Sequence, residues 1–489
     1  MALLNGLGNK VFGENFVGRK NLVRRLQEGC TSQNFSVVGL PKIGKSSLVY
    51  HSLITNKDSV RRNNSRKFIP VFIDCGPASS LYGFFNPIIE GIYNSLREVI
   101  PAEQLTNLTK NYSEYKDGVI TDLSGYVLSF IKTIENYQIN IVLILDEFDR
   151  VRVIPDFDGT KFALLRTILE HNFINIVTIS KRSLDILEGW NEDPNHNPSN
   201  FYQCFIEIIV SNFEPNEWDE YWDKIDSEYS GCFEEHPFNK EEIKRKAFSF
   251  TGNNPYWTAF FAKRYVDSLK YELPFDETTI LDEMIRGAYN PMKDFLCDDR
   301  NYRNNILDTA IQSILGPVYM TKREDITLLE KYGFLTKIES DKKKSLFGSN
   351  AKNGLYFFDN GIEKSYIAIN TQFTLFLIRE LNFFKVTYWK EWDDFFFAWY
   401  SLLDQLSLPT CETIGASLML LPDVKERWDL DFKPIFGNKG FEWFSTRYNY
   451  VIGFCCLEMD KLPIDYGIIN RRNRYLGEFV RMMEIYQLS

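Results

Sequence analysis

The octet at residues 39–46 reads Gly39-Leu40-Pro41-Lys42-Ile43-Gly44-Lys45-Ser46. It directly follows the apolar run Phe35-Ser36-Val37-Val38, which predicts a buried strand. The octet matches the pattern G-x-x-x-x-G-K-[S/T], whose glycines allow backbone N–H groups to surround a polyphosphate. In such a loop the lysine reaches the β- and γ-phosphate oxygens, and the hydroxyl binds Mg²⁺. The sequence therefore predicts a phosphate-binding loop; a glycine-rich turn before an ordinary helix is the alternative.

Within this loop, we predict that Lys45 is catalytic and that Ser46 holds Mg²⁺. The residues predicted to contact ATP are Gly39, Pro41, Gly44, Lys45, Ser46 and the following Ser47.

A second apolar run, Ile141-Val142-Leu143-Ile144-Leu145, ends in the two acids Asp146 and Glu147. Five consecutive apolar residues are typical of a central parallel strand that is buried on both faces. We predict that Asp146 holds Mg²⁺ and that Glu147 orients or deprotonates the attacking water. The second acid favours hydrolysis over binding alone. A strand-end turn with solvated acids is the alternative interpretation.

Further apolar segments recur at the spacing of an α/β domain. Strands are predicted at 67–75, 175–180 and 204–210, and helical patterns at 81–99 and 123–134. With the two strands named above, five strands alternate with helices. This alternation predicts a five-stranded parallel sheet that is covered by helices on both faces.

Length and composition set the broad class. A chain of 489 residues is too long for one core and favours three or four domains. It has no apolar run long enough to span a bilayer, and its first residues lack the build of a signal peptide. We therefore expect a cytoplasmic protein without a membrane partner. Its eight cysteines and four histidines are scattered, which predicts neither a zinc site nor a disulfide framework.

The net charge of the chain affects which binding partners we expect. The formal net charge of −10 argues against a nucleic-acid footprint over the whole chain, although a local basic patch is compatible with it. Acids gather in the segment 214–235, where they alternate with Trp218, Tyr221 and Trp222. This pattern predicts a helix with a solvated acidic face and a buried aromatic stripe.

Five motifs in order resemble the STAND ATPases, the archaeal-type ATPases and the related origin-recognition AAA+ proteins. Besides the loop at 39–46 and the acids at 146–147, the resemblance is carried by three segments. They are Phe16-Val17-Gly18-Arg19 with the helix to Leu26, Ile179-Ser180-Lys181-Arg182-Ser183-Leu184, and Thr251-Gly252-Asn253-Asn254-Pro255-Tyr256. Together these motifs cover about residues 12 to 270.

The resemblance implies roles for several residues. It places Phe16, Val17, Gly18 and Arg19 against the adenine, Arg182 near the γ-phosphate as a catalytic sensor, and Pro255 of a helical lid on the base. A Gly-Arg turn before an ordinary helix is the alternative for Gly18 and Arg19, and a surface arginine the alternative for Arg182.

Four other polar residues receive weaker interpretations. Asn253 stands where many relatives have glycine, which places the close backbone approach there in doubt. Arg264 on the same lid is not predicted to be a sensor, and Asp149 and Arg150 are interpreted as ordinary loop charges.

Four domains are predicted, the first three from this resemblance and the last from its composition. They are a P-loop ATPase core at 1–212, a helical lid at 213–290, a winged helix at 291–382 and a mostly helical, aromatic-rich domain at 383–489. The winged helix is expected to contain a helix before Gly333, strands near 356–358 and 366–369, and a closing helix at 373–381. A solvated hairpin tip is preferred over a DNA contact for the wing lysines Lys342, Lys343, Lys344 and Lys352. In the last domain, Arg471, Arg472 and Arg474 are interpreted as a solvated turn.

The function predicted from these observations is a STAND-like switch that binds and hydrolyses ATP with Mg²⁺. In relatives such modules serve bacterial signalling and anti-phage defence, so a homo-oligomer or a co-encoded effector is the expected partner. One alternative is a DNA-associated ATPase of initiator or mobile-element type. The other is a scaffold that is locked by ATP and does not hydrolyse it.

Overall fold

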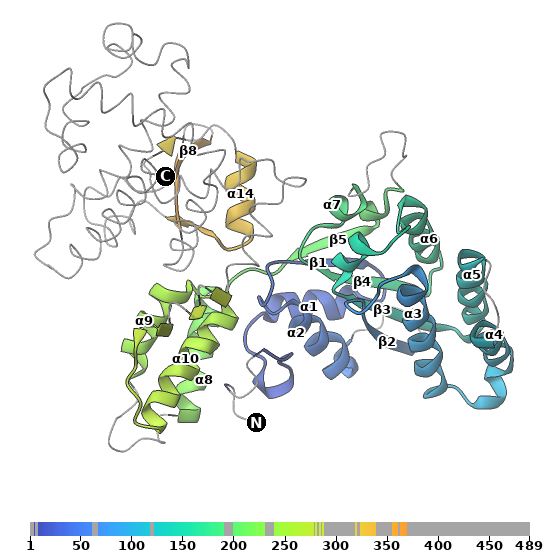
Figure 1. Cartoon of the computed structure of the whole chain (residues 1–489), viewed down its shortest axis with the longest axis horizontal. Helices are drawn as coiled ribbons and strands as arrows, with labels where there is room; N and C mark the ends of the chain where they lie inside the picture. Colours follow the sequence, from blue (N-terminus) through green and yellow to red (C-terminus); the bar gives the residue numbers. More distant parts are fainter. Residues whose placement is uncertain are drawn as a thin grey trace, which may run out of the picture. The chain divides into compact units, whose positions relative to one another are not determined.

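The structure is a computed structural model that describes part of the chain. The described residues are 4, 8–60, 67–117, 122–189, 199–229, 239–277, 279–280, 283–284, 286–287, 318–319, 323–338, 355–359 and 362–368. The chain divides into two compact units, one of residues 1–248 and 253–276 and the other of residues 249–252 and 277–489. The units are described separately below, and Figure 1 labels their elements.

A five-stranded sheet forms the centre of the first unit. Its strands are β1 (Asn34–Val38), β2 (Lys67–Asp74), β3 (Ile139–Asp146), β4 (Ile174–Ser180) and β5 (Phe205–Ile209). They lie in the order β2-β3-β4-β1-β5, and every pair of neighbours is parallel. The predicted parallel sheet is therefore confirmed, and each predicted strand lies within two residues of an observed one.

All eight residues of β3 are buried, as expected for a strand with a neighbour on each side and helices on both faces. Alternate side chains divide between the faces because the side-chain period of a strand is two. Ile141, Leu143 and Leu145 belong to a core cluster that also contains apolar residues of α3 (Leu81–Arg97), α5 (Leu123–Ile134) and α6 (Gly159–Leu169). This core packs against β3 as far as Leu145, the residue before Asp146.

The remaining helices of the core connect or flank these strands. They are α1 (Lys20–Gly29), α2 (Lys45–Tyr50), which continues into a π-helical turn η2 (His51–Thr55), α4 (Thr106–Asp117) and α7 (Leu184–Glu188). The helix α4 has no counterpart among the predicted helices. Its sequence is rich in polar residues, so its periodic signal is weak.

Three helices follow the sheet: α8 (Pro215–Tyr229), α9 (Lys240–Thr251) and α10 (Pro255–Lys270). The predicted aromatic stripe of α8 is confirmed, because Trp218, Tyr221 and Trp222 are all buried. The helix α10 begins at a proline, which suits the first helical position because a proline lacks the N–H that would be unpaired there. The side chain of the preceding Asn254 caps this helix by accepting a hydrogen bond from Trp257 N at 3.1 Å.

The described part of the second unit includes a helix and a small sheet. The helix is α14 (Arg323–Lys331), and the strands are β6 (Val318–Tyr319), β7 (Leu335–Ile338), β8 (Leu355–Asp359) and β9 (Ile362–Ala368). Their order is β6-β8-β9-β7, with β9 antiparallel to both β8 and β7. The predicted helix before Gly333 and the strands after it are thus present.

Several predictions fall on other parts of the chain. The closing helix at 373–381, the four wing lysines, the domain at 383–489 and the arginines near 472 lie outside the described residues. The four domain boundaries and the winged helix stay predictions. Among the described helices, none combines the length and the apolar character that crossing a bilayer requires.

Candidate functional site

The loop between β1 and α2 approaches the neighbouring strand end very closely. Gly39 has a φ of +156°, and a Cβ atom added there would collide with the backbone carbonyl oxygen of Val210. Gly44 has a φ of +98°, a value that an L side chain rarely adopts. Both positions therefore favour glycine. A side chain at residue 39 would collide with Val210, and the backbone at residue 44 has a positive φ.

Lys45 is folded back onto its own loop. Its Nζ donates to the carbonyl oxygens of Gly39 and Leu40, each at 2.9 Å. Burial lowers the pKa of Lys45 to about 8, against the opposing effect of the acids Asp149 and Asp146. The ammonium is thus held by neutral carbonyls close to the acids, and negative phosphate oxygens would be stronger partners for it.

Ser46, in the first turn of α2, is in contact with Asp146, at the end of β3. The hydroxyl of Ser46 donates to Asp146 Oδ1 at 2.8 Å, and the same oxygen accepts the N–H of Glu147 at 3.0 Å. Asp146 is buried, with 4% of its surface exposed. The Nζ of Lys10 lies 3.2 Å from its other oxygen, Oδ2.

Two further carboxylates lie at this edge of the sheet. Glu147 is exposed and adopts a left-handed backbone conformation with a φ of +52°. Asp74, at the end of β2, pairs in register with Asp146 at the end of β3. Sequence reasoning missed Asp74, although an acid at the end of a predicted neighbouring strand is a signal that could have found it.

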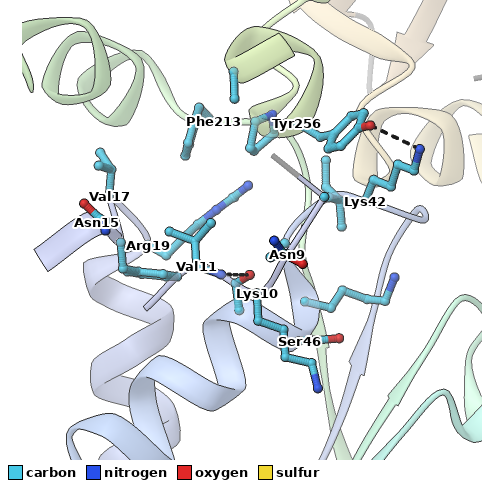
Figure 2. Close-up of a pocket in the computed structure, with 18 of the residues that line it drawn as sticks. Asn9, Lys10, Val11, Asn15, Val17, Arg19, Lys42, Ser46, Phe213 and Tyr256 are labelled. Carbon is cyan, nitrogen blue, oxygen red and sulfur yellow. Dashed lines mark hydrogen bonds between the residues drawn. The ribbon is translucent and has the colours of Figure 1, made fainter. Parts of the chain in front are cut away.

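These groups line one cavity of about 420 Å³. Figure 2 shows this cavity with residues from the core and from the helices after the sheet around it. Of the residues predicted to form the site, ten lie in the lining: Phe16, Val17, Arg19, Gly44, Lys45, Ser46, Ser47, Asp146, Glu147 and Pro255. Gly18, Gly39, Pro41 and Arg182 are not among the lining residues. The lining residues that were not predicted include Asn9, Lys10, Val11, Asn15, Lys42, Asp74, Phe213, Tyr221 and Tyr256.

Arg19 is bound mainly by protein groups. Its guanidinium donates to the carbonyl oxygens of Ser211 and Asn212 and lies 3.8 Å from the carboxylate of Glu217, and both charged side chains are more than 90% buried. Burial lowers the pKa of Arg19, and Glu217 opposes this effect. The Glu217 side chain also accepts the backbone N–H of Arg19 and packs against Gly18.

The Gly-Arg pair therefore connects the core to α8, a role that the sequence did not indicate. Its predicted contact with adenine stays a prediction. Phe16, from the same motif, stacks on His51 with ring centroids 4.2 Å apart and ring planes 9° apart.

One side of the cavity is formed by the start of α10. Pro255 and Tyr256 both line the cavity, and Lys42 of the phosphate-binding loop donates to the Tyr256 hydroxyl at 3.3 Å (Figure 2). The Lys42 Nζ also lies 4.4 Å from the centroid of the Tyr256 ring, a cation–π geometry. Asn253 has a φ of +64°, a left-handed conformation that asparagine tolerates better than most residues with a side chain.

Arg182 lies in the turn after β4 and faces Asp149. Its Nη1 is 3.8 Å from Asp149 Oδ1, while Asp149 Oδ2 accepts the N–H of Lys181 at 2.5 Å. The interpretation of Asp149 as an ordinary loop charge was wrong, because its carboxylate connects the turn after β4 to the segment that follows β3. Arg150, interpreted in the same way, donates through Nε to the carbonyl oxygen of Ala78 at 2.6 Å.

The donor set suits a magnesium nucleotide. Mg²⁺ prefers oxygen ligands, and the Ser46 hydroxyl and the Asp146 carboxylate provide them at 2.8 Å from one another on the cavity wall. The cavity volume of about 420 Å³ also lies in the range of small-molecule sites. The residues present therefore fit the group that the motif implies.

Comparisons with known proteins found matches among solved structures alone. No family model matches the sequence, and no curated protein matches it. A Walker-type ATPase of Pyrococcus abyssi is similar at 16% identity, over 77% of this chain and 99% of that chain, with a TM-score of 0.45.

Two further solved structures are similar at 13% identity. The first is the ORC1 protein of Aeropyrum pernix in complex with DNA, which is similar over 77% of this chain and 94% of that chain with a TM-score of 0.39. The second is AMPPCP-bound DnaA from Aquifex aeolicus, which is similar over 67% of this chain and 81% of that chain with a TM-score of 0.34. Assignment to the STAND ATPases stays a prediction.

Proposed function

We propose that the protein binds ATP with Mg²⁺ in the cavity between the phosphate-binding loop and α10, and hydrolyses it. The observation that carries this proposal is the contact between Ser46 and Asp146. A hydroxyl and a carboxylate, both of which suit Mg²⁺, thus lie next to Lys45 on the wall of one cavity. Titration of the protein with ATP by calorimetry, together with phosphate release, tests binding and turnover separately.

Each residue has a distinct task in this proposal. Lys45 exchanges the two loop carbonyls for phosphate oxygens, which stabilise its charged form. Ser46 and Asp146 hold the metal, which when bound neutralises charge that develops on the phosphates. Glu147 is exposed beside Asp146 and can orient or deprotonate the attacking water.

A bound nucleotide would change how the helices after the sheet, which act as a lid in this proposal, are arranged on the core. The cavity is lined by the core and also by Tyr221 of α8 and by Pro255, Tyr256 and Ala259 of α10. A ligand that contacts both parts stabilises one arrangement of them by its differential affinity. ADP lacks the γ-phosphate and is therefore expected to stabilise this arrangement less.

We propose further that this change makes the protein a nucleotide-dependent switch of the STAND type in bacterial signalling or anti-phage defence. A second copy of the chain or a co-encoded effector would be its partner, in the cytoplasm. The family resemblance supports this role. Light scattering and hydrogen exchange of the nucleotide-free, ADP and slowly hydrolysed ATP forms test it, and identical mass and exchange in all three would contradict it.

Association with DNA is the second candidate function. Lys342, Lys343 and Lys344 fall in the sequence between β7 and β8, in the segment that the family resemblance interprets as a wing. If they contact phosphates, changing all three to alanine weakens DNA binding and lowers its salt slope by about one per lost contact. Salt-dependent binding that is lost in the triple variant would favour this function over the signalling switch.

A scaffold that is locked by ATP and does not hydrolyse it is the third candidate. It shares the binding site and differs only in the task of Glu147. Turnover that is negligible in the wild type and unaffected by Glu147→Gln would favour the scaffold.

A further inference from the structure

The chain before the first helix lies along the helix of the phosphate-binding loop. The N–H of Val11 donates to Ser47 Oγ at 3.0 Å, and the N–H of Gly13 donates to His51 Nδ1 at 3.1 Å. Ser47 and His51 are four residues apart, about one helical turn, so the two contacts follow one face. The ring of Phe16 adds the stack on His51. The segment 11–16 is thus attached to α2 and η2 at several points.

This attachment brings Lys10 to the metal end of the cavity. Its Nζ lies 3.2 Å from Asp146 Oδ2 and 3.9 Å from the centroid of the Phe72 ring. The Lys10 side chain is 39% exposed, whereas the Asp146 side chain is 6% exposed. Figure 2 shows Lys10 and Ser46 at the same end of the pocket. No motif in the sequence marks Lys10 as a site residue.

Lys10 completes the set of partners around a buried carboxylate. Asp146 Oδ1 accepts from the Ser46 hydroxyl and from the N–H of Glu147, and the ammonium of Lys10 lies against Oδ2. A buried carboxylate needs such a partner, since isolated burial of a charge is unfavourable. The positive charge of Lys10 therefore compensates the negative charge of Asp146 in the absence of metal.

Mg²⁺ needs the same carboxylate. The ion takes oxygen ligands in a strict octahedral geometry, and an ammonium group on the same acid repels it and occupies its position. We propose that Lys10 is a built-in counter-ion that occupies Asp146 until Mg²⁺ binds, and that metal binding displaces it. This inference rests on the proposed function, because Asp146 is the metal ligand of that proposal.

The displacement would have two effects on the site. Before metal binds, Lys10 keeps Asp146 oriented towards Ser46, so the two ligands are already together. When metal binds, the side chain of Lys10 must leave Asp146, and the segment that carries it loses one of its contacts with the core. Lys10 would thus set the concentration of metal at which the site is filled.

Metal binding to the ADP complex tests the proposal without measuring turnover. Mn²⁺, whose binding is followed by electron paramagnetic resonance, serves as the probe. Lys10→Met removes the competing charge, and we expect it to lower the dissociation constant of Mn²⁺ by about three- to tenfold. Lys10→Arg retains the charge and is expected to stay within about twofold of the wild type.

The matched control is Lys20→Met, which removes the same charge from an exposed lysine that pairs with Glu220 outside the cavity. An unchanged or weaker Mn²⁺ affinity in Lys10→Met would overturn the proposal, as would an equal gain in the Lys20 variant. Asp146→Asn distinguishes a failure of the proposed metal site from a failure of the counter-ion proposal. If this variant binds Mn²⁺ as the wild type does, the proposed metal site itself fails, whereas loss of Mn²⁺ with no effect of Lys10→Met refutes the counter-ion alone.

Discussion

The hydroxyl of Ser46 donates a hydrogen bond to Asp146 at 2.8 Å, although the two residues are 100 positions apart in the chain. Ser46 is the last residue of the phosphate-binding loop and lies in the first turn of α2, and Asp146 ends β3. In the sheet, β4 lies between β1 and β3, so the contact reaches past one intervening strand. The two halves of the candidate metal site are therefore assembled by the order of the strands.

Lys45→Ala removes the positive charge that the proposal directs to the phosphates. We expect hydrolysis to fall by at least about 100-fold, because a lost charged donor is costly in a water-poor site. Phosphate release measures turnover, and calorimetry measures whether ATP still binds. An unchanged melting temperature would show that the fold is intact, and near-normal hydrolysis would refute the assignment of the site.

Glu147→Gln keeps the size of the side chain and removes its ability to accept a proton. We expect ATP binding to persist within a few-fold and turnover to fall by about 100-fold or more, in the upper range for loss of a general base. Single-turnover measurements separate this effect from product release. Turnover equal to that of the wild type would exclude Glu147 as the base and direct attention to Asp74.

Arg19→Ala breaks a buried ion pair and leaves the Glu217 carboxylate without its charged partner. We expect the free energy of unfolding to fall by about 3 kcal/mol or more. The matched control is Lys20→Ala, which breaks the exposed pair with Glu220 and is expected to cost less than about 1 kcal/mol. Denaturant titrations compare the two, and equal losses would contradict the connecting role of Arg19.

Gly39→Ala places a Cβ atom against the carbonyl oxygen of Val210. We expect it to destabilise the protein by about 1 to 3 kcal/mol, the usual cost of overpacking. Gly83→Ala is the control, because its nearest neighbour would be Ser80 Oγ at 3.2 Å, the end of a short side chain at the start of α3. If thermal unfolding shows both variants to be equally stable, Gly39 is not required by this contact.

Asp149→Asn removes the negative charge that faces Arg182. If Arg182 is a sensor of the γ-phosphate and Asp149 positions it, we expect each single variant, Asp149→Asn and Arg182→Ala, to lower turnover by about tenfold. The double variant should then be little worse than either, because both changes act on one unit. Additive losses in the double-mutant cycle would show that the two residues act independently.

Local patterns predicted the elements of the core and much of its site. The run Ile141 to Leu145 is apolar at every position because both faces of β3 are covered, and this property is legible without a structure. The octet at 39–46 combines a required backbone conformation with two required side chains, so its residues indicate phosphate binding by themselves. In the same way, Pro255 marks the start of α10 because proline suits the first helical position.

Contacts between distant residues were decided by the tertiary structure alone. A lysine such as Lys10 in a polar N-terminal segment has no local signal, and only the attachment of that segment to α2 brings it to Asp146. Arg19 was assigned to a nucleotide from its motif, whereas the closeness of α8 supplies Glu217 as its partner.

The physical reason for this division is the range of the interactions. Secondary structure and turn conformation depend on neighbours in sequence, so the chain itself determined the strands, the phosphate-binding loop and the paired acids of this protein. Ion pairs such as Lys10–Asp146 and Arg19–Glu217 depend on which strands and helices lie side by side. The packing of the sheet and the helices decides that arrangement, and with it the charges that surround the candidate metal site.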